Sequence, residues 1–508
     1  MNGQVHEVYR KKGIRLSADM SPLLYKYFYA AMRGKAWKGL HMFDKAHTLM
    51  MTEEGVIPKE AGVAILKALR QMEREGVEKV RESLGGHMHC GEAYATMTLG
   101  AESAGWIHAG RSSGDLQAVA CRVDARDMEI AFMRGLIGIK KTLLSRAEEH
   151  IDTVMPGYTH LQHAEPITFG FYLLSFVHQF ERDFERLQGA YKRTNISPAG
   201  CAILTTTDFP INRKRTQELM GFDGILTNAK DAIWTMDYLV ECLSAIMGTA
   251  GNLTRLADDL TIWHSSEFRM AEIPDEFCGT SSIMPQKKNP YGTEAVRGLS
   301  GDVIGNVMAF YAQTNHQSDS CEMLTMAPLC LYQAADRCLA ALEIMDGVLK
   351  GLKVNKEIMG KRAGMFWSQA TSLANTLVRE KRLPFRSAHQ IIGVLVRMAY
   401  DEGKAPADVT TEMIDAASRE VTGQSIGLSE KGLRQALNPA SIVRSKKAIG
   451  GTAPERVEED IRGSLERMRE EEQIVAEIEA ELAHAGRELE AAIDAIIGEQ
   501  GRAPENHP

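Results

Sequence analysis

The apolar positions of the chain recur at helical spacing over long stretches. From Asp115 to about His150 they return every three or four residues, over about ten turns of a regular helix. A second long helix is expected after Pro166, a third over 229–263, and a further one over 294–312. Strand-like alternation is hard to find. Helices of this length, separated by loops rich in Gly and Pro, predict an all-α protein with a long central bundle.

Breaks in this pattern divide the chain into three predicted domains. Shorter helical pieces, such as 57–76, occupy the first part and are interrupted by Gly85 and Gly86. From Val457 the chain is rich in Glu and Arg, with apolar residues in a gapped four-three pattern that predicts a long C-terminal helix. Its acidic side is most simply a solvated face, and a partner-binding helix is the alternative. We expect an N-terminal helical domain at 1–113, a central bundle at 114–365 and a C-terminal helical domain at 366–508.

Composition narrows the function classes. The 508 residues include 59 Lys and Arg against 67 Asp and Glu, a formal net charge of −8, and no basic stripe stands out, so neither nucleic acid nor a membrane surface is an expected partner. Aromatic residues make up only 6%, which favours helices over sheets. The 8 cysteines form no C-x-x-C pair, the start lacks an apolar signal core, and no long apolar run occurs. We expect reduced thiols and a cytoplasmic location.

The segment 279–290 is the most unusual one. It combines three hydroxyls, two ammonium groups and two carboxamides within a dozen residues, with Met284-Pro285 in its middle. Such a loop offers many groups that can bind an anion. A solvated surface loop is the alternative, but a mobile polar loop needs no Met-Pro in its middle.

Two further segments carry candidate chemistry. Pro156 to His163 forms a tight turn with two imidazoles, and His160-x-x-His163 could be half of a metal site, although no Cys/His cluster or H-E-x-x-H motif accompanies it. His87 and His89 are no better supported as ligands, and hydrogen-bonded structural histidines are the alternative for all of them. Ser112 and Asp115 precede a helix whose amino end can bind an anion, although capping alone would explain both. We therefore predict no metal site.

Five separated segments form a specific pattern: Ser281–Pro290, Thr159–Gln162, Thr206–Arg213, Ala374–Val378 with Leu383–Arg386, and Gly450–Pro454. They occur in the order found in argininosuccinate lyases, and the chain resembles that family, which belongs to the fumarase/aspartase superfamily. That resemblance implies an all-α, three-domain subunit whose long helices assemble into a homotetramer, with each active site built from segments of three subunits. It also implies reversible elimination of fumarate from an N-substituted aspartate, with a small dicarboxylate substrate and no metal or organic cofactor.

The resemblance assigns roles that suit this chemistry. A proton must leave a carbon beside a carboxylate, and the departing nitrogen must be protonated, so the site needs a base, an acid and fixed positive charge. By resemblance Ser281 is the base, and its anion needs backbone N–H groups and nearby cations. Lys287 and Asn289 hold the carboxylate where charge accumulates, while His160, paired with Glu294, is the candidate for proton transfer to nitrogen. Substrate-contact positions are His89, Arg111, Ser112, Thr159, Gln162 and Ser282.

The chain also departs from the family pattern. Argininosuccinate lyases carry Gly-Arg-Ser-Arg-Asn-Asp where this chain has Ser113 and Gly114 in place of the second arginine and the asparagine. Tyr291 replaces an aspartate, and the segment 315–322 lacks the tyrosine and terminal lysine that contact the amino-acid end. These changes favour a leaving amine without a guanidino group, from a substrate of the iminodisuccinate or ethylenediamine-disuccinate type. Argininosuccinate lyase itself is the alternative enzyme, and a catalytically silent, crystallin-like structural protein is the alternative of another class.

Overall fold

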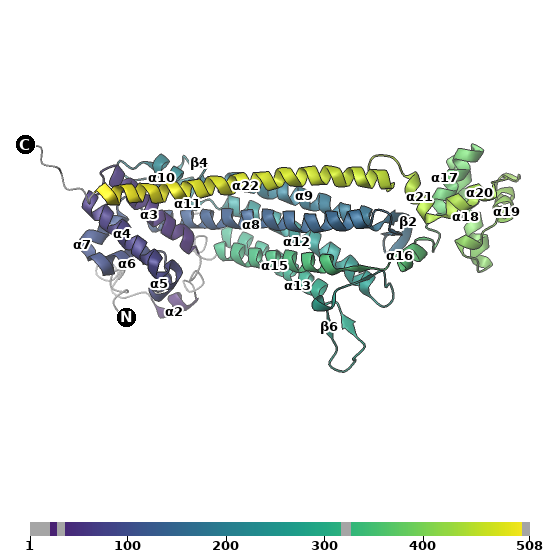
Figure 1. Cartoon of the computed structure of the whole chain (residues 1–508), viewed down its shortest axis with the longest axis horizontal. Helices are drawn as coiled ribbons and strands as arrows, with labels where there is room; N and C mark the ends of the chain where they lie inside the picture. Colours follow the sequence, from purple (N-terminus) through teal and green to yellow (C-terminus); the bar gives the residue numbers. More distant parts are fainter. Residues whose placement is uncertain (1–20, 28–35, 316–326, 500–508) are drawn as a thin grey trace, which may run out of the picture.

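Helices build most of the structure, as the sequence predicts. A computed structural model describes residues 21–27, 36–315 and 327–499. Long parallel and antiparallel helices form an extended central body, with a cluster of shorter helices at each end (Figure 1). The prediction of an all-α fold with a long central bundle is confirmed.

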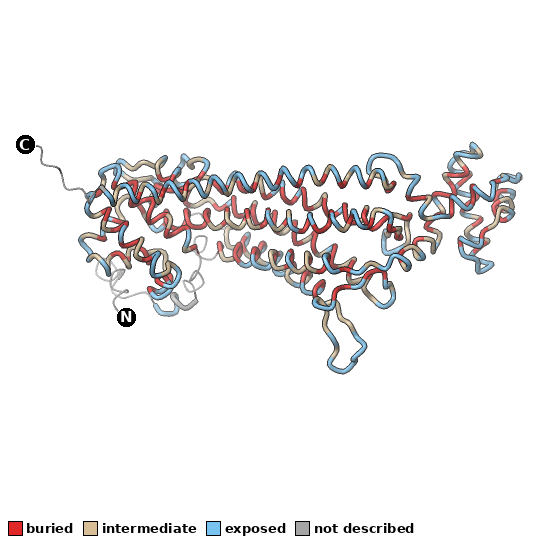
Figure 2. The backbone as a smooth tube through the Cα atoms, in the orientation of Figure 1, coloured by how far each residue is buried: buried red, intermediate tan, exposed pale blue. Residues whose placement is uncertain are grey.

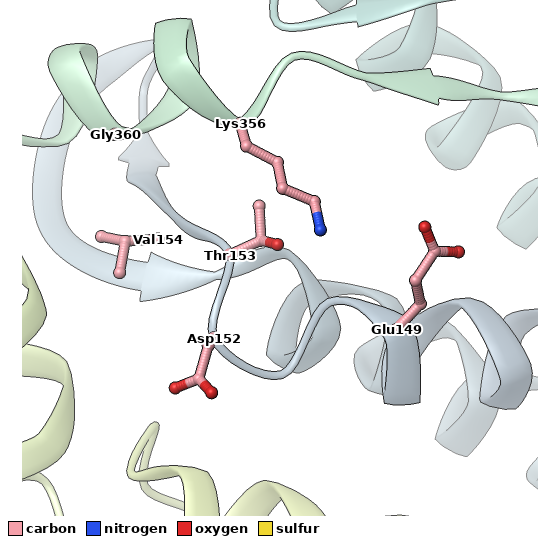
Figure 3. A pocket seen from close by; sticks show the side chains of 6 residues that line it. All are labelled: Glu149, Asp152, Thr153, Val154, Lys356 and Gly360. Atoms are coloured by element: carbon pink, nitrogen blue, oxygen red, sulfur yellow. The ribbon is translucent and has the colours of Figure 1, made fainter.

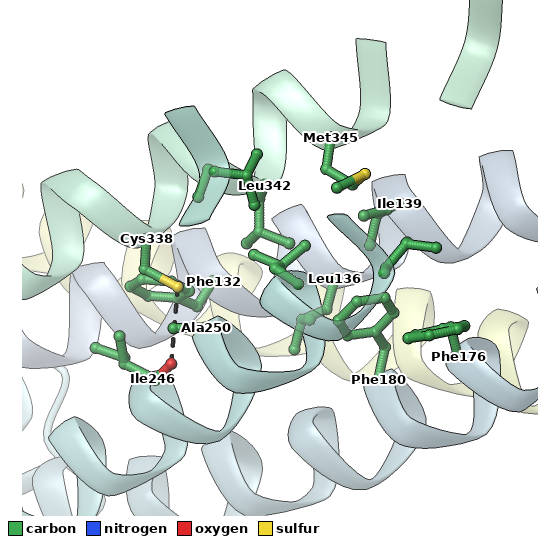
Figure 4. Close-up of a cluster of buried hydrophobic side chains, with 14 of the residues drawn as sticks. Phe132, Leu136, Ile139, Phe176, Phe180, Ile246, Ala250, Cys338, Leu342 and Met345 are labelled. Atoms are coloured by element: carbon green, nitrogen blue, oxygen red, sulfur yellow. Dashed lines mark hydrogen bonds between the residues drawn. The ribbon is translucent and has the colours of Figure 1, made fainter. Parts of the chain in front are cut away.

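The central bundle consists of five long helices. The first, α8, is 37 residues long and starts at Ser113 because Ser112 caps it: the Ser112 hydroxyl accepts a hydrogen bond from the N–H of Gly114, and the Asp115 carboxylate accepts one from the N–H of Ser112. Phenylalanine and aliphatic side chains from α8, α9, α12 and α15 interlock in one continuous core (Figure 4). The helices are α8 (Ser113–Glu149), α9 (Phe169–Thr194), α12 (Asp237–His264), α13 (Tyr291–Thr314) and α15 (Ala327–Gly351).

One predicted helix is two helices in the structure. The stretch expected to be continuous over 229–263 divides into α11 (Ala229–Trp234) and α12, with Thr235 in an extended conformation between them. Ile233 of α11 packs in a small cluster with Cys201, whereas Leu239 of α12 packs in the core of the bundle. The helices α11 and α12 bury their apolar side chains in different clusters, so the backbone has to turn between the two helices.

Short strands also occur, in segments where strand-like alternation is hard to find in the sequence. They form four two-stranded sheets among the described residues. The longest is an antiparallel hairpin between α8 and α9. The pairs are β1 (Val154–Thr159) with β2 (Gln162–Thr168), β3 (Ile196–Ser197) with β4 (Gly224–Ile225), β5 (Ala271–Glu272) with β8 (Lys353–Val354), and β6 (Gly279–Thr280) with β7 (Lys288–Asn289).

The two end clusters contain the shorter helices. Of these, α10 (Arg213–Leu219) lies beside α3 and the C-terminal helix, and α16 (Lys356–Ala363) lies on β1. The N-terminal cluster holds α2 (Pro22–Tyr27), α3 (Trp37–Glu53), α4 (Lys59–Glu75), α5 (Val77–Ser83), α6 (Cys90–Leu99), α7 (Ala101–Ala104) and the 3-10 turn η2 (Gly105–His108). The C-terminal cluster holds α17 (Ala370–Lys381), α18 (Phe385–Asp401), α19 (Thr411–Thr422), α20 (Glu430–Leu437) and α21 (Pro439–Ser445).

The last helix, α22 (Pro454–Glu499), returns along the whole bundle. It starts beside the C-terminal cluster, packs on α8 and α9, and ends against α3 and α4 (Figure 1). Its inner side contributes Val457 and Val475 to the core, while its outer side is exposed (Figure 2). The predicted long helix is therefore confirmed. The division into domains at 113 and 365 stays a prediction, with the qualification that α22 packs on the central and N-terminal parts.

Two simpler expectations also bear on the described residues. No helix among them is long and apolar enough to cross a membrane. Seven cysteines lie in the described part of the chain, and all seven are free thiols.

Candidate functional site

Ser281 lies at the start of a loop that projects from the bundle. The short strands β6 and β7 pair at its base and carry it away from the helices (Figure 1). The Oγ of Ser281 accepts hydrogen bonds from the backbone N–H groups of Ile283 and Met284, at 3.3 and 3.0 Å. Two N–H dipoles therefore point at the oxygen that would carry negative charge if the hydroxyl lost its proton.

The two lysines of this loop are in different situations. Lys288 makes ion pairs with Glu272 and Asp275 at 2.8 and 2.6 Å, which tie the base of the loop to β5 and its following turn. Lys287 is exposed, and its ammonium has no hydrogen-bond or ion-pair partner among the described residues. The loop thus presents one cation for a ligand and uses the other for anchoring. Ser282 is exposed and Asn289 half-buried on the same loop.

His160 lies at the tip of the β1–β2 hairpin. Thr159 pairs with Gln162, so His160 and Leu161 are the two central residues of the turn. Both have left-handed backbones, with φ of 54° and 56°, a conformation that costs residues other than glycine about 1–3 kcal/mol each. Strain of this kind concentrates at functional sites, and the imidazole of His160 is exposed at this turn.

The partner predicted for His160 is elsewhere in the subunit. Glu294 is exposed in the first turn of α13, and no hydrogen bond or ion pair of the described residues joins it to His160. His163, by contrast, is half-buried between the rings of Tyr158 and Phe366. Burial and the nearby Arg362 charge lower the pKa of His163, so it fits the structural alternative.

Ser112 and Arg111 stand at the other end of α8. The Ser112 hydroxyl caps the helix, and burial raises the pKa of the Asp115 carboxyl behind it to about 7. Arg111 does not face solvent: its guanidinium donates to Asp44 at 2.9 Å, and its side chain is 1% exposed. The structure thus places Arg111 in a buried ion pair in place of the expected substrate contact. Its partner is the carboxylate of Asp44, which is far away in the sequence.

His89 contacts Ser113, a position where the chain departs from the family pattern, and Glu92, which the sequence motifs did not single out. Its Nε2 lies 2.8 Å from the Oγ of Ser113, and its Nδ1 lies 3.7 Å from Oε2 of Glu92. The Nδ1 of His108 lies 2.9 Å from the same Glu92 oxygen. The spacing His89-x-x-Glu92 at the start of a helix was a visible signal for part of this cluster, whereas the approach of His108 depends on the η2 turn.

The predicted site residues lie in three separate places of one subunit. The His89 and Ser112 group is at the start of α8, and the His160 hairpin follows its far end, about 55 Å away at 1.5 Å per residue. The Ser281 loop projects from a third point along the bundle (Figure 1).

A pocket of about 350 Å³ opens at the end of the bundle, lined by Glu149, Asp152, Thr153, Val154, Lys356 and Gly360 (Figure 3). It contains none of the predicted site residues. The altered segment 315–322 lies, apart from Asn315, outside the described residues.

Comparison with known proteins gives the family. Residues 24–305 match a lyase family and residues 367–444 match the C-terminal region of argininosuccinate lyases. The argininosuccinate lyase of Methanosarcina acetivorans is 37% identical over 459 residues, covering 89% of this chain and 91% of that protein. The argininosuccinate lyase of Methanocaldococcus jannaschii is 38% identical over 442 residues, covering 85% and 89%.

Solved structures agree with this assignment. EDDS lyase in complex with formate superposes with a TM-score of 0.87 at 29% identity, covering 94% of each chain. A class II fumarase from Schistosoma mansoni, at 16% identity and a TM-score of 0.65 over 80% of this chain and 90% of its own, shares the fold.

These matches, together with the helical bundle and the Ser281 loop, define the class: the chain belongs to the lyase family of the fumarase/aspartase superfamily and is a fumarate-releasing lyase. Within it the protein is a carbon–nitrogen lyase of the argininosuccinate lyase type.

Proposed function

We propose that this lyase releases fumarate from an N-substituted aspartate or aminopolycarboxylate whose leaving amine carries no guanidino group. The observation that carries the proposal is the environment of Ser281. Its oxygen accepts hydrogen bonds from two backbone N–H groups, and the ammonium of Lys287, which has no partner among the described residues, lies on the same loop. A serine hydroxyl in that setting loses its proton more readily than the hydroxyl of a free serine. The resulting anion is the base that is needed to remove a proton from carbon.

The other site residues then take complementary roles. Ser281 removes the proton beside the carboxylate, and Lys287 with Asn289 stabilises the doubly charged enolate-like intermediate. His160, assisted by Glu294, delivers a proton to the departing nitrogen. Thr159, Gln162, Ser282, Ser112 and His89 bind the substrate. The strained backbone at His160 supports a role for the hairpin tip in this chemistry.

The nature of the amine is inferred from the start of α8. Ser113 and Gly114 cannot supply the bidentate charge that an arginine gives to a carboxylate. Arg111 offers no replacement, because Asp44 holds its guanidinium. Structural similarity to EDDS lyase at a TM-score of 0.87 supports an aminopolycarboxylate of the ethylenediamine-disuccinate type, and an iminodisuccinate type is also compatible.

Argininosuccinate lyase activity is the second candidate. Its support is the 37% identity to the Methanosarcina acetivorans enzyme over 91% of that relative. A silent, crystallin-like role is the candidate of another class, and the presence of Ser281, His160, Lys287, Asn289 and Glu294 argues against it.

We further propose that the active subunit assembly is a homotetramer with shared sites. The three site segments are too far apart in one chain to hold one small substrate. In addition, α13 exposes Ile304, Met308 and Tyr311 at helical spacing, between 44% and 62% each, beside Gly301 and Gly305, which have open space around them. An exposed apolar stripe beside small residues suits close packing of a second copy of the same helix.

The deciding experiment runs the reaction in reverse. Excess fumarate is incubated with a panel of amines, including arginine, ethylenediamine and aspartate, and adducts are identified by mass. Adducts with non-guanidino amines but not with arginine support the proposal. An arginine adduct formed in preference to the others would instead establish the argininosuccinate lyase candidate, and absence of any adduct, together with no fumarate release in the forward direction, would favour the silent protein.

A further inference from the structure

The pocket at the end of the bundle is lined by side chains of opposite charge. Lys356 comes from α16 and Glu149 from the last turn of α8. Figure 3 shows the ammonium of Lys356 and the carboxylate of Glu149 converging on this pocket from two sides. We propose that the pocket binds a small α-amino acid as its zwitterion, with the ligand carboxylate on Lys356 and the ligand ammonium on Glu149.

Lys356 is available for an anion. Its side chain is exposed and makes no hydrogen bond or ion pair with the described residues. Lys356 is also the first residue of α16, and the amino end of a helix carries partial positive charge. The ammonium and the helix end together favour a carboxylate at this side of the pocket.

Glu149 is held in place through one oxygen and is open at the other. Its Oε2 accepts a hydrogen bond from Arg146, which also donates to the backbone carbonyl of Leu352 at 2.6 Å. Its Oε1 lies 3.5 Å from Nε2 of the buried His150. Burial lowers the pKa of His150 to about 4, so this imidazole is uncharged at neutral pH and does not neutralise the carboxylate. The Oε1 atom can therefore accept a charge-assisted hydrogen bond from the ammonium of a ligand.

A glycine in the wall leaves room for the ligand. Gly360 lies inside α16, and a Cβ at this position would meet no atom within 4 Å. Glycine is a poor residue for a helix interior, and here the missing side chain keeps the wall of the pocket empty. The pocket volume of about 350 Å³ is near the lower end of the range of about 300–1,000 Å³ found for ligand pockets, which limits the ligand to a small molecule.

The charges around the pocket favour a zwitterion over a singly charged ligand. Asp152 also lines the pocket, and its side chain is 72% exposed. A dicarboxylate would be repelled by Glu149 and Asp152, whereas a simple amine would be repelled by Lys356. None of the predicted site residues lines this pocket. The inference therefore goes beyond the proposed function and does not depend on it.

Binding is tested on the full-length protein by isothermal titration calorimetry, with L-alanine as the probe. We expect saturable binding with a dissociation constant of about 1 mM or lower, which is within reach of so small a ligand. Ethylamine and propionate each carry only one of the two charged groups and should bind at least tenfold more weakly.

Two substitutions test the charged contacts. Lys356→Gln and Glu149→Gln should each weaken L-alanine binding at least tenfold, because each removes one charge-assisted contact. Lys431→Gln and Glu148→Gln are the matched controls and should leave binding unchanged. Lys431 is an exposed lysine in the first turn of α20, which has the same length as α16, and Glu148 is the exposed neighbour of Glu149.

A third substitution tests the location. Gly360→Leu places a side chain in the open space of the pocket and should abolish L-alanine binding, while it improves the helix propensity of α16. Gly393→Leu is its control, because Gly393 is also a helical glycine with open space around it, but lies in α18. In wild type, L-alanine should slow hydrogen exchange of the amides of α16.

Four outcomes overturn the inference: no saturable binding up to about 10 mM L-alanine, equally tight binding of ethylamine or propionate, binding that survives Gly360→Leu, or displacement of L-alanine by fumarate. The last outcome would place L-alanine in the catalytic site. If Glu149→Gln alters the circular dichroism spectrum, Lys356→Gln and Gly360→Leu decide. A protein that releases fumarate but does not bind L-alanine refutes this inference and leaves the proposed function intact. A protein that binds L-alanine but forms no fumarate refutes the proposed function alone.

Discussion

The carboxylate of Asp44 bonds to two buried arginines, and removing its charge should destabilise the N-terminal part of the protein. Its oxygens accept from Arg81 at 2.6 Å and from Arg111 at 2.9 Å, and the side chains of both arginines are at most 1% exposed. Burial raises the pKa of Asp44, but the charges of Arg111 and Arg81 outweigh burial and hold the pKa below its usual value. The substitution Asp44→Asn keeps the shape and removes the charge.

The expected cost follows from this geometry. Breaking a buried ion pair by removing one partner costs about 3–5 kcal/mol, because the remaining charge stays buried without compensation. Here two guanidinium groups lose their shared partner, so we expect the upper end, about 5 kcal/mol. Since each 1.4 kcal/mol is a factor of ten, amides of α3 that exchange through opening of this region should exchange a few thousandfold faster.

Hydrogen exchange followed by mass spectrometry measures this change peptide by peptide. Glu420→Gln is the matched control, because the Arg397–Glu420 pair is as short, at 2.7 Å, but more than half exposed, and its loss should cost less than about 1 kcal/mol. Because folding lowers the pKa of Asp44, the ionised carboxylate contributes stability at pH values above the ordinary pKa of an aspartate. This contribution is lost as the pH falls through the lowered pKa. The difference in stability between wild type and Asp44→Asn should therefore become smaller at acidic pH. A cost no larger than that of the control would refute the reasoning.

Four further predictions concern chemistry and pH. Ser281→Ala should cut fumarate release by several orders of magnitude without changing the circular dichroism spectrum, and near-normal turnover would remove Ser281 from the mechanism. Wild-type protein should cleave argininosuccinate poorly, and the double substitution Ser113→Arg with Gly114→Asn should raise that activity about ten- to hundredfold per restored contact; a wild-type specificity constant of about 10⁵ M⁻¹s⁻¹ would contradict this. Mixed tetramers of His160→Asn and Ser281→Ala subunits should regain at most roughly a quarter of wild-type sites, whereas no recovery after verified exchange would exclude shared sites. Burial raises the pKa of Glu129 to about 8, so wild-type stability should fall as the pH rises from about 4.5 to 8; Glu129→Gln should lack this fall, and parallel melting curves at pH 5 and pH 9 would be the contrary result.

The helices were predictable because their signals are local. The apolar period fixes α8, and Ser112 with Asp115 marks its start through a capping box within four residues. The break after Trp234 was not predictable, because no Gly or Pro marks it and its cause is packing against residues distant in the sequence. The left-handed turn at His160 and Leu161 runs against the intrinsic preference of both residues.

The same distinction holds for the candidate site. The motif around Ser281 located a loop whose backbone N–H groups bond to that hydroxyl, as its proposed role requires. The motif around Arg111 could not reveal that Asp44, 67 residues away, takes up the guanidinium. Residue types could be read from the chain, but their partners depend on the three-dimensional packing.

The return of α22 along the bundle has a consequence for how the protein is made. Leu489 and Ile493 complete the apolar core around Phe43, and Lys45 forms an ion pair with Glu490, which follows 445 residues later. The N-terminal helices leave the ribosome first, yet part of their core is synthesised almost last. Until then their apolar surface is uncovered, and transiently exposed apolar surface of this kind is prone to aggregation. The N-terminal core is therefore complete only after α22 has been synthesised and has packed against it.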